Sequence, residues 1–335
     1  MRKGTSLAGA MLTAAGLCGG IFFSATSGAQ DPRKAENSPQ VLDELTVAGE
    51  HTGPGMWHVH GGPANNRGAG NLWILGSMSP LPKGITWRSK QLEQLLDHTD
   101  RVVIAKPIEI GIFRVVWLFI TQRELLMVRG GKRLKDVMPP GLYARFAVLR
   151  TQYAGDSDKW ERFRPLIATA FLGQAAFHKV GLSARLDLGA AVRKLAEKRG
   201  VRVEELKIAG VRDALDALKT MPPATENACV EASLVTIERD LPRLIERAQA
   251  WATGNVERIQ ALHQPPEVDS CRAALDEGTG PGEVIAQMRR TWLDSMDRYL
   301  RGEGVTVAVV NMDMLLEKGG LLEELREKGY DVEAR

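Results

Sequence analysis

Two polar turns, one near each end of the chain, carry the side chains best placed to do chemistry. Each turn follows an apolar run, the first at residues 71–75 and the second at residues 305–310. In an α/β fold such turns lie at the carboxyl ends of strands, where ligands usually bind. The sequence therefore predicts a binding cleft whose lining includes the turn residues Gly76, Ser77, Ser79, Asn311, Asp313 and Met314.

Polar side chains in and near these turns are the candidates for catalysis. Asp313 and Glu109 offer carboxylates for acid–base work or for a divalent cation, and Asn311 offers an amide beside them. Ser79, like Ser77, is a nucleophile only where a base lies nearby, and no local sequence context supports one. An aspartate directly after a strand is more typical of a turn or a helix cap, so a structural role stays open for Asp313.

His58 and His60 occupy alternate positions of an apolar run. Because side chains alternate across a strand, both imidazoles lie on one face, and this spacing allows them to chelate a metal ion. Trp57 and Val59 are expected to face the core, which leaves the two histidines pointing outward. The competing interpretation is that they are exposed polar residues without a ligand.

The first 29 residues have the features of a secretory signal. Arg2 and Lys3 form a basic start, residues 7–23 are apolar, and small residues at Ser27 and Ala29 offer a cleavage site. The apolar stretch is marginal in length and rich in glycine for a membrane span, so a retained anchor is the less favoured alternative. We expect cleavage near Ala29 and a periplasmic or secreted protein that is not integral to the membrane.

Charge and composition exclude one class of partner. Cleavage after residue 29 removes two basic residues and no acidic one, which leaves 42 basic against 41 acidic residues. Such a balanced chain without a basic block lacks the electrostatic footprint of a nucleic-acid binder. Residues 30–50 are polar and patternless and are predicted to form a flexible tail, and residues 51–335 are predicted to form the folded domain.

Cys229 and Cys271 are the two cysteines that follow the signal segment. An even pair in an exported protein favours a disulfide, here between two helical segments. Two buried thiols that act as small hydrophobes are the alternative.

Apolar periodicity predicts an α/β (α+β) fold with a mixed central sheet formed from both terminal regions. A hairpin at residues 56–60 and 71–75 is followed by a helix at 87–98 and a strand at 101–105, which together indicate a parallel crossover. A long helical insertion at about 139–301 separates these elements from the last ones. Helical periodicity covers residues 141–153, 159–179, 189–200, 225–253 and 282–301, with N-caps at Asp187 and Asn255. A break at Pro242 is the alternative for the segment at 225–253. A strand at 305–310, a helix at 321–328 and a strand at 330–332 follow.

Residues 108–127 are the hardest stretch to assign. The segment is rich in Ile, Val and Phe and contains Trp117, but four charged residues interrupt it. It is too charged for a membrane span, and a buried helix or a hairpin fits its composition. Core burial is the favoured interpretation, and a partner-binding surface of a structural envelope protein is the alternative.

Four stretches of the sequence, taken in order, resemble the TraB/GumN family. They span an opening hairpin, an Ala-Trp-Ala-x-Gly element, a last helix and strand, and a closing Gly-Leu-Leu and Gly-Tyr-x-Val signature, at residues 56–76, 250–255, 298–309 and 320–332. The likeness covers nearly all of residues 56–335. It implies a metallohydrolase scaffold of the kind found in the TIKI proteases, which cleave peptides.

The resemblance also implies where a metal site would lie. In the family, two Gly-x-x-His turns and a strand-end Glu are taken as the ligands of a divalent cation that activates water. The corresponding positions here are Ser79, Met314 and Ala105, and the last of these joins the predicted cleft. A hydroxyl, a thioether and a methyl group do not make a zinc site.

Two functions follow as expectations. The first is a non-catalytic protein of the cell envelope that binds a peptide or another small ligand in the predicted cleft, with no cofactor. The second is a metal-dependent hydrolase or peptidase whose divergent site uses Asp313, Asn311, Glu109 or the pair of His58 and His60. A divalent metal is expected only under the second.

Overall fold

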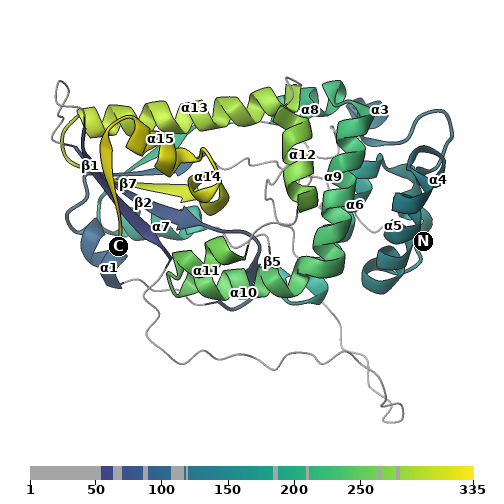
Figure 1. Ribbon diagram of the computed structural model, residues 1–335, viewed down its shortest axis with the longest axis horizontal. Helices are drawn as coiled ribbons and strands as arrows, with labels where there is room; N and C mark the ends of the chain where they lie inside the picture. Colours follow the sequence, from purple (N-terminus) through teal and green to yellow (C-terminus); the bar gives the residue numbers. More distant parts are fainter. Residues whose placement is uncertain are drawn as a thin grey trace, which may run out of the picture.

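Strands from both ends of the chain meet in one six-stranded sheet. The computed structural model describes residues 54–62, 70–85, 90–106, 117, 120–183, 188–208, 211–262, 266–276 and 280–335, and Figure 1 shows their arrangement. The strands of the sheet are β1 (Met56–Gly61), β2 (Asn71–Ser77), β4 (Arg101–Ala105), β6 (Arg202–Leu206), β7 (Val305–Asn311) and β8 (Tyr330–Ala334). Their order across the sheet is β6-β4-β7-β2-β1-β8.

The sheet is mixed, as predicted. Strands β2, β7, β4 and β6 pair in parallel, whereas β1 is antiparallel to both β2 and β8. The hairpin of β1 and β2 and the buried strand β4 form where the apolar alternation placed them. The predicted α/β class with a mixed central sheet is therefore confirmed.

One strand of the sheet comes from the middle of the chain, which the sequence did not indicate. Strand β6 lies within the segment predicted to be a helical insertion and pairs with β4 at the edge of the sheet. Its sequence, Arg-Val-Glu-Glu-Leu, has few apolar residues because an edge strand is only partly covered. The sheet therefore takes one strand from the predicted helical insertion in addition to those from the terminal regions.

Helices cover both faces of the sheet. Helix α13 (Gly280–Arg301) and helix α15 (Leu321–Glu327) lie on one face, and helix α1 (Lys90–Leu96) and helix α7 (Leu188–Lys198) lie on the other (Figure 1). Tyr299 of α13 donates a hydrogen bond to Glu204 of β6 over 2.7 Å. Burial, together with that carboxylate, raises the pKa of the Tyr299 hydroxyl to about 12, so this contact stays neutral on its tyrosine side near pH 7.

A second hydrophobic core lies in a helical lobe beside the sheet. Helices α5 (Pro140–Ala154), α6 (Pro165–Lys179) and α9 (Pro223–Val235) pack around Phe146, Leu172 and Leu234. In Figure 1, α13 runs along one side from the sheet to this lobe. The remaining elements are α3 (Arg123–Leu126), α4 (Leu134–Val137), a 3-10 helix (Asp158–Arg162), α8 (Val211–Thr220), α10 (Leu241–Ala252), α11 (Val256–Ala261), α12 (Pro266–Asp276), α14 (Met312–Leu316) and the small pair β3 (Leu81–Pro82) and β5 (Leu182–Ser183).

Prolines divide two of the long predicted helices. The segment at 225–253 forms α9 and α10 with a π-helical turn at Thr236–Asp240 between them, directly before Pro242. Proline lacks a backbone N–H and displaces the preceding carbonyl, which disrupts the regular helical hydrogen bonds. The segment at 159–179 also forms two elements, a 3-10 helix at Asp158–Arg162 and α6, which begins at Pro165.

The segment at 108–127 departs from its predicted burial where the structure describes it. Trp117 is 57% exposed and Ile120 is 73% exposed, so core burial was wrong at both positions. The last described part forms α3, and Leu125 and Leu126 there do reach the helical-lobe core. Most of the segment, as well as the predicted cap Asp187, lies outside the described residues.

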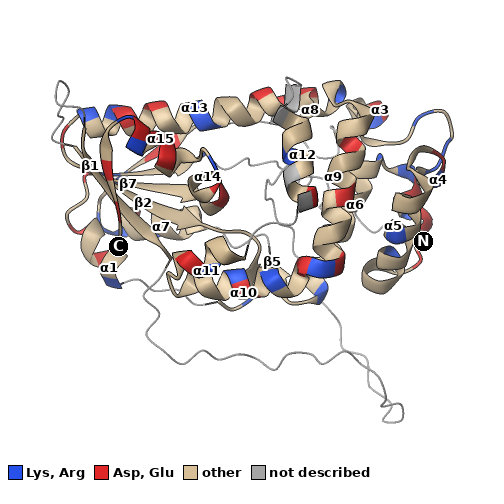
Figure 2. Cartoon of the chain, in the orientation of Figure 1, with Lys and Arg blue, Asp and Glu red and all other residues tan. Residues whose placement is uncertain are grey.

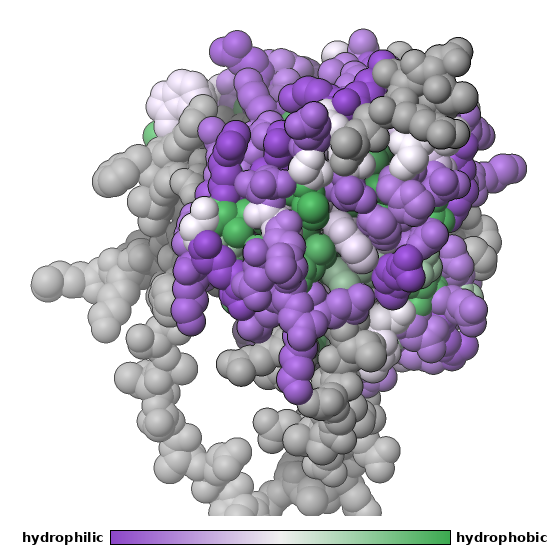
Figure 3. All heavy atoms as spheres, turned by 90° about the vertical axis from the view of Figure 1, so that its left-hand side faces the viewer, coloured by the Kyte–Doolittle hydropathy of each residue, from purple (hydrophilic) through white to green (hydrophobic). Residues whose placement is uncertain are grey.

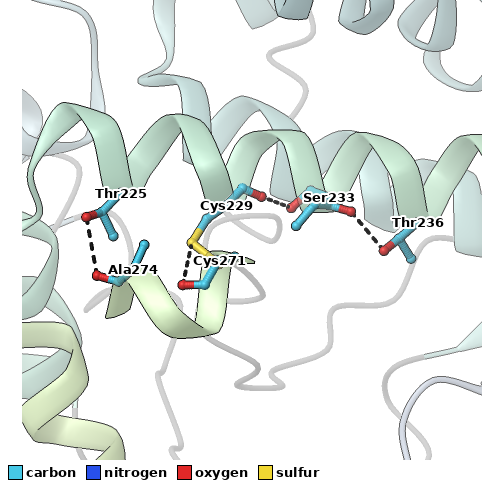
Figure 4. The surroundings of a disulfide bond; sticks show 7 residues. Thr225, Cys229, Ser233, Thr236, Cys271 and Ala274 are labelled. Carbon is cyan, nitrogen blue, oxygen red and sulfur yellow. Dashed lines mark hydrogen bonds between the residues drawn. A yellow bond between two sulfur atoms is a disulfide. The ribbon is translucent and has the colours of Figure 1, made fainter. Parts of the chain in front are cut away.

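The predicted disulfide is present. Cys229 of α9 and Cys271 of α12 are bonded, and Thr225 of α9 donates a hydrogen bond to the carbonyl of Ala274 one turn away (Figure 4). The bond closes a loop with a sequence separation of 42 residues. By loop-closure entropy, a bridge of this span stabilises the folded chain by roughly 4 kcal/mol.

The described surface is polar and carries both signs of charge. Lys and Arg alternate with Asp and Glu along α13 and the neighbouring helices in Figure 2. Figure 3 looks onto the left-hand side of Figure 1, and the described part of that face is largely hydrophilic, with hydrophobic side chains only in small groups. In the part of the chain that the structure describes, no helix has the length and apolarity needed to cross a membrane.

Gly70 makes the junction between the end of α13 and the start of β2 possible. A Cβ placed there would lie 3.0 Å from the carbonyl oxygen of Leu300 and still closer to that of Tyr299. These are backbone atoms, so they cannot rotate away as a side chain would. The sheet and α13 therefore approach each other at a distance that only glycine allows.

We expect Gly70→Ala to lower the free energy of unfolding by about 1–3 kcal/mol, because the added methyl group forces the backbone apart. The matched control is Gly173→Ala in α6, where a Cβ meets nothing within 4 Å. Alanine at that helical position should leave stability unchanged or raise it by about 0.5–1 kcal/mol. Urea unfolding followed by tryptophan fluorescence measures both, and equal losses in the two variants would contradict the packing argument.

Candidate functional site

The parallel strands end together at one edge of the sheet. Ser77, the last residue of β2, lies opposite Asn311 of β7, and Ile104 of β4 lies opposite Val309. A pocket of about 100 Å³ opens at this edge. Its lining comes from three strands and from the start of α7, namely Ser77, Ile104, Ala105, Val309, Gly189, Ala190 and Arg193.

The polar groups at this pocket suit a negatively charged ligand. Arg193 brings a guanidinium group and Ser77 a hydroxyl. Gly189 and Ala190 belong to the first turn of α7, whose backbone N–H groups lack partners inside the helix, and no acidic side chain stands in that turn. The pocket is below the roughly 300–1,000 Å³ of sites for drug-sized ligands, so it accommodates a small group or one end of a longer molecule.

Arg193 is held in place by a neighbouring strand. Its guanidinium pairs with the carboxylate of Glu205 on β6, and the ammonium group of Lys106 lies 3.8 Å from the same carboxylate. Two positive groups therefore share one negative partner beside the pocket. The surplus positive charge adds to the preference for an anion.

Behind the pocket, the first polar turn is joined to the helical insertion. The indole N–H of Trp251 on α10 donates a hydrogen bond to the carbonyl oxygen of Gly76 over 2.8 Å, and both groups are buried. A Cβ at Gly76 would lie 2.8 Å from the sulfur of Met312 and 3.2 Å from the ring of Trp57. A side chain here would force Met312 and Trp57 to shift, so glycine favours this close packing.

The second polar turn is the start of a short helix. Asn311 caps α14, since its side-chain oxygen accepts hydrogen bonds from the backbone N–H groups of Asp313 and Met314 at 2.9 and 3.3 Å. Asp313 pairs with Arg247 of α10 at 2.6 Å. Arg247 is 9% exposed, so the Asp313 carboxylate supplies the charge partner of an almost buried guanidinium.

The structure places the predicted site residues in several different environments. Ser77 and Ala105 line the pocket. Gly76 is buried behind it, and Asn311 and Asp313 take part in the cap and the ion pair just described. Met314 packs against the core of the sheet, Ser79 is exposed beside the cis peptide bond to Pro80, and Glu109 lies outside the described residues.

The positions that the resemblance assigns to a metal do not fit one. Ser79, Ala105 and Met314 offer a hydroxyl, a methyl group and a thioether, and Ala105 alone of the three lines the pocket. Within the described residues, the group of three donors close enough to share an ion is His58, His60 and Glu333. Those residues lie on β1 and β8, away from the carboxyl ends of β2, β4 and β7.

Several residues of the site gave little sign in the sequence. Arg193 belongs to a helix that was predicted from its periodicity, but its charge looks like that of any solvated helix face. Its role depends on the contact of α7 with β4 and β6, which is tertiary. Trp251 belongs to the Ala-Trp-Ala element, and the resemblance of that element to the family was the signal that the sequence offered.

Comparisons with known proteins bear on nearly the whole described chain. The model of one family, described as the TraB/PrgY/gumN family, matches residues 55–334. No curated protein and no solved structure gives a significant match. The match spans the sheet, the helical lobe and the pocket.

We expect Asp313→Asn to destabilise the protein by about 1–2 kcal/mol, because it leaves the nearly buried guanidinium of Arg247 without a charge partner, while the partial exposure of Asp313 limits the loss. The double variant with Arg247→Met should recover most of that loss, since the unpaired charge is removed as well. Chemical unfolding of the wild type, the two single variants and the double variant measures this coupling. Strictly additive losses would show that the pair does not hold α10 on α14.

Proposed function

The chain belongs to the TraB/PrgY/gumN family, and from that premise we propose that it is a non-catalytic protein of the cell envelope that binds a small ligand or a peptide through a carboxylate group. The observation that carries the proposal is the composition of the pocket at the carboxyl edge of β2, β4 and β7. Among the residues that the structure describes, its lining offers a guanidinium, a hydroxyl and the first turn of a helix, and no imidazole, thiol or carboxylate.

The chemistry of these groups supports binding through a carboxylate. Guanidinium groups recognise carboxylates with paired, charge-assisted hydrogen bonds. Backbone N–H groups at a helix start add favourable charge. The small volume fits a single carboxylate with its neighbouring atoms, as at the end of a peptide, with the rest of the ligand outside the pocket.

The location in the envelope rests on two further features. Residues 1–29 have the pattern of a secretory signal with cleavage near Ala29. The disulfide between Cys229 and Cys271 favours an oxidising compartment, such as the periplasm or the outside of the cell. Both features support a periplasmic or secreted protein.

Replacement of Arg193 by Gln is expected to weaken ligand binding by about 10-fold or more, the loss of affinity that follows from removal of a charge-assisted hydrogen bond. The probes are a library of short peptides with free carboxyl ends, the same peptides with amidated ends, and small carboxylic acids, screened by ligand-detected NMR. Only probes with a free carboxylate should bind. Ala190→Leu should also reduce binding, because it fills the pocket without any change of charge.

Arg199→Gln is the matched control for this series. Arg199 follows the last residue of α7 and pairs with Glu93 and Asp97 in the same manner, but it does not line the pocket. Its replacement should leave binding unchanged. Equal binding of free and amidated peptides, or equal effects of the two arginine variants, would overturn the proposal.

A metal-dependent hydrolase with a divergent site is the second candidate, because Asn311 and Asp313 place an amide and a carboxylate at the end of β7 and the start of α14. We expect the purified protein to leave the peptide library intact, both alone and with added Zn²⁺, Mn²⁺ or Co²⁺, since both groups are engaged in a cap and an ion pair. Mass spectrometry of the peptides is the readout. Cleavage that disappears with Asp313→Asn or with His58→Asn would establish the hydrolase instead.

A further inference from the structure

Two histidines and a glutamate come together on the antiparallel side of the sheet. His58 and His60 occupy alternate positions of β1, and Glu333 of β8 lies opposite His58 in the strand register. One donor atom from each of the three lies within 4.8 Å of the others, and His60 Nε2 is 3.5 Å from a carboxylate oxygen of Glu333. We infer that His58, His60 and Glu333 form a binding site for a divalent transition metal of the zinc class.

This site is separate from the pocket at the carboxyl edge. His60 lies opposite Asp331 of β8, and Val59 beside it pairs with Leu72 near the start of β2. The pocket instead adjoins Ser77 at the end of β2. The histidine site therefore lies beside the start of β2 and the pocket lies at its end, and the two sites do not share a residue.

The donor set matches the metal class. Two imidazoles and one carboxylate are ligands of borderline cations such as Zn²⁺, Co²⁺ and Ni²⁺, whereas Ca²⁺ and Mg²⁺ prefer oxygen ligands alone. Three protein ligands leave a coordination position for water or for another molecule. The histidines are half-buried and Glu333 is exposed, so an ion can reach them from solvent.

His58 is already oriented for such a role. Its ring stacks on Trp73 of β2 at 4.4 Å between centroids, and its Nε2 lies 3.2 Å from the side-chain oxygen of Asn71. An amide oxygen only accepts, so Nε2 carries the proton of this hydrogen bond and Nδ1 keeps its lone pair for a metal. Outer hydrogen bonds of this kind fix the tautomer and orientation of metal-binding histidines.

Burial lowers the pKa of the His58 imidazole. The hydrogen bond to Asn71 and the charge of Glu333 raise this pKa, while the nearby His60 and Arg335 lower it further. The neutral ring is the form that binds metals. Arg335 also pairs with Glu333, so a cation competes with its guanidinium for the carboxylate. Removal of that guanidinium should therefore strengthen metal binding.

The test uses purified full-length protein without a polyhistidine tag, titrated with Zn²⁺ by calorimetry and with Co²⁺ by visible absorption. We expect one equivalent to bind, with affinity reduced more than 10-fold in His58→Asn, His60→Asn and Glu333→Gln. Asn71→Ala should reduce affinity by about 10–100-fold, the usual effect of losing an outer hydrogen bond. Arg335→Gln should raise affinity.

Two controls keep the result interpretable. His178→Asn removes an exposed histidine of α6 in the other lobe and should bind metal as the wild type does. Arg193→Gln should bind metal normally even though it weakens the carboxylate ligand, which separates this site from the pocket. Glu333 is exposed, so its Gln variant keeps the fold; wild-type affinity in that variant, or no stoichiometric binding to the wild type, would overturn the inference.

Discussion

The buried hydrogen bond from the indole of Trp251 to the carbonyl of Gly76 fixes the relation between the sheet and the helical insertion. An indole N–H sealed away from water must find an acceptor. A side chain at position 76 would press on Met312 and on the ring of Trp57. The backbone N–H of Gly76 is bonded in turn to Gly55. The ends of β2 and β7, α10 and the start of α14 are therefore held at one point, and the pocket beside them takes its shape from this junction.

The same sheet presents opposite chemistry at its two ends. At the carboxyl ends of the parallel strands the available groups are a guanidinium, a hydroxyl and the start of a helix, which favour an anion. On the antiparallel side, imidazoles and a carboxylate favour a cation. Parallel pairing places the carboxyl ends of the strands and the helices that follow them at the same edge of the sheet. Antiparallel pairing of β1 with β8 instead places Glu333 opposite His58, and the next residue on the same face of β1 is His60.

The sequence predicted those parts of the molecule that depend on local pattern. Strand β4 was predicted at its observed bounds because Val102, Val103 and Ile104 form a continuous apolar run, and all three are buried. Strand β6 was not predicted, because an edge strand needs few apolar residues. Ser77 was predicted as a cleft residue because it follows an apolar strand, whereas Ala105 was predicted because the resemblance places a strand-end ligand position there. The position of Arg193 depends on how α7 packs on the sheet, and no feature of its neighbours in the chain encodes that contact.

The strand pairing also sets an order of events during folding. Trp57 of β1 pairs with Ala334 of β8, and Leu72 of β2 pairs with Thr306 of β7, so the first two strands find these partners far along the chain, beyond the helical lobe. Such distant pairings form slowly, because a long loop must close before any contact stabilises it. Until then, the helical lobe can assemble from contacts nearer in sequence, while β1 exposes unpaired backbone groups that attract other chains. The nascent protein therefore passes through a period in which protection of its first strands by a chaperone would matter most.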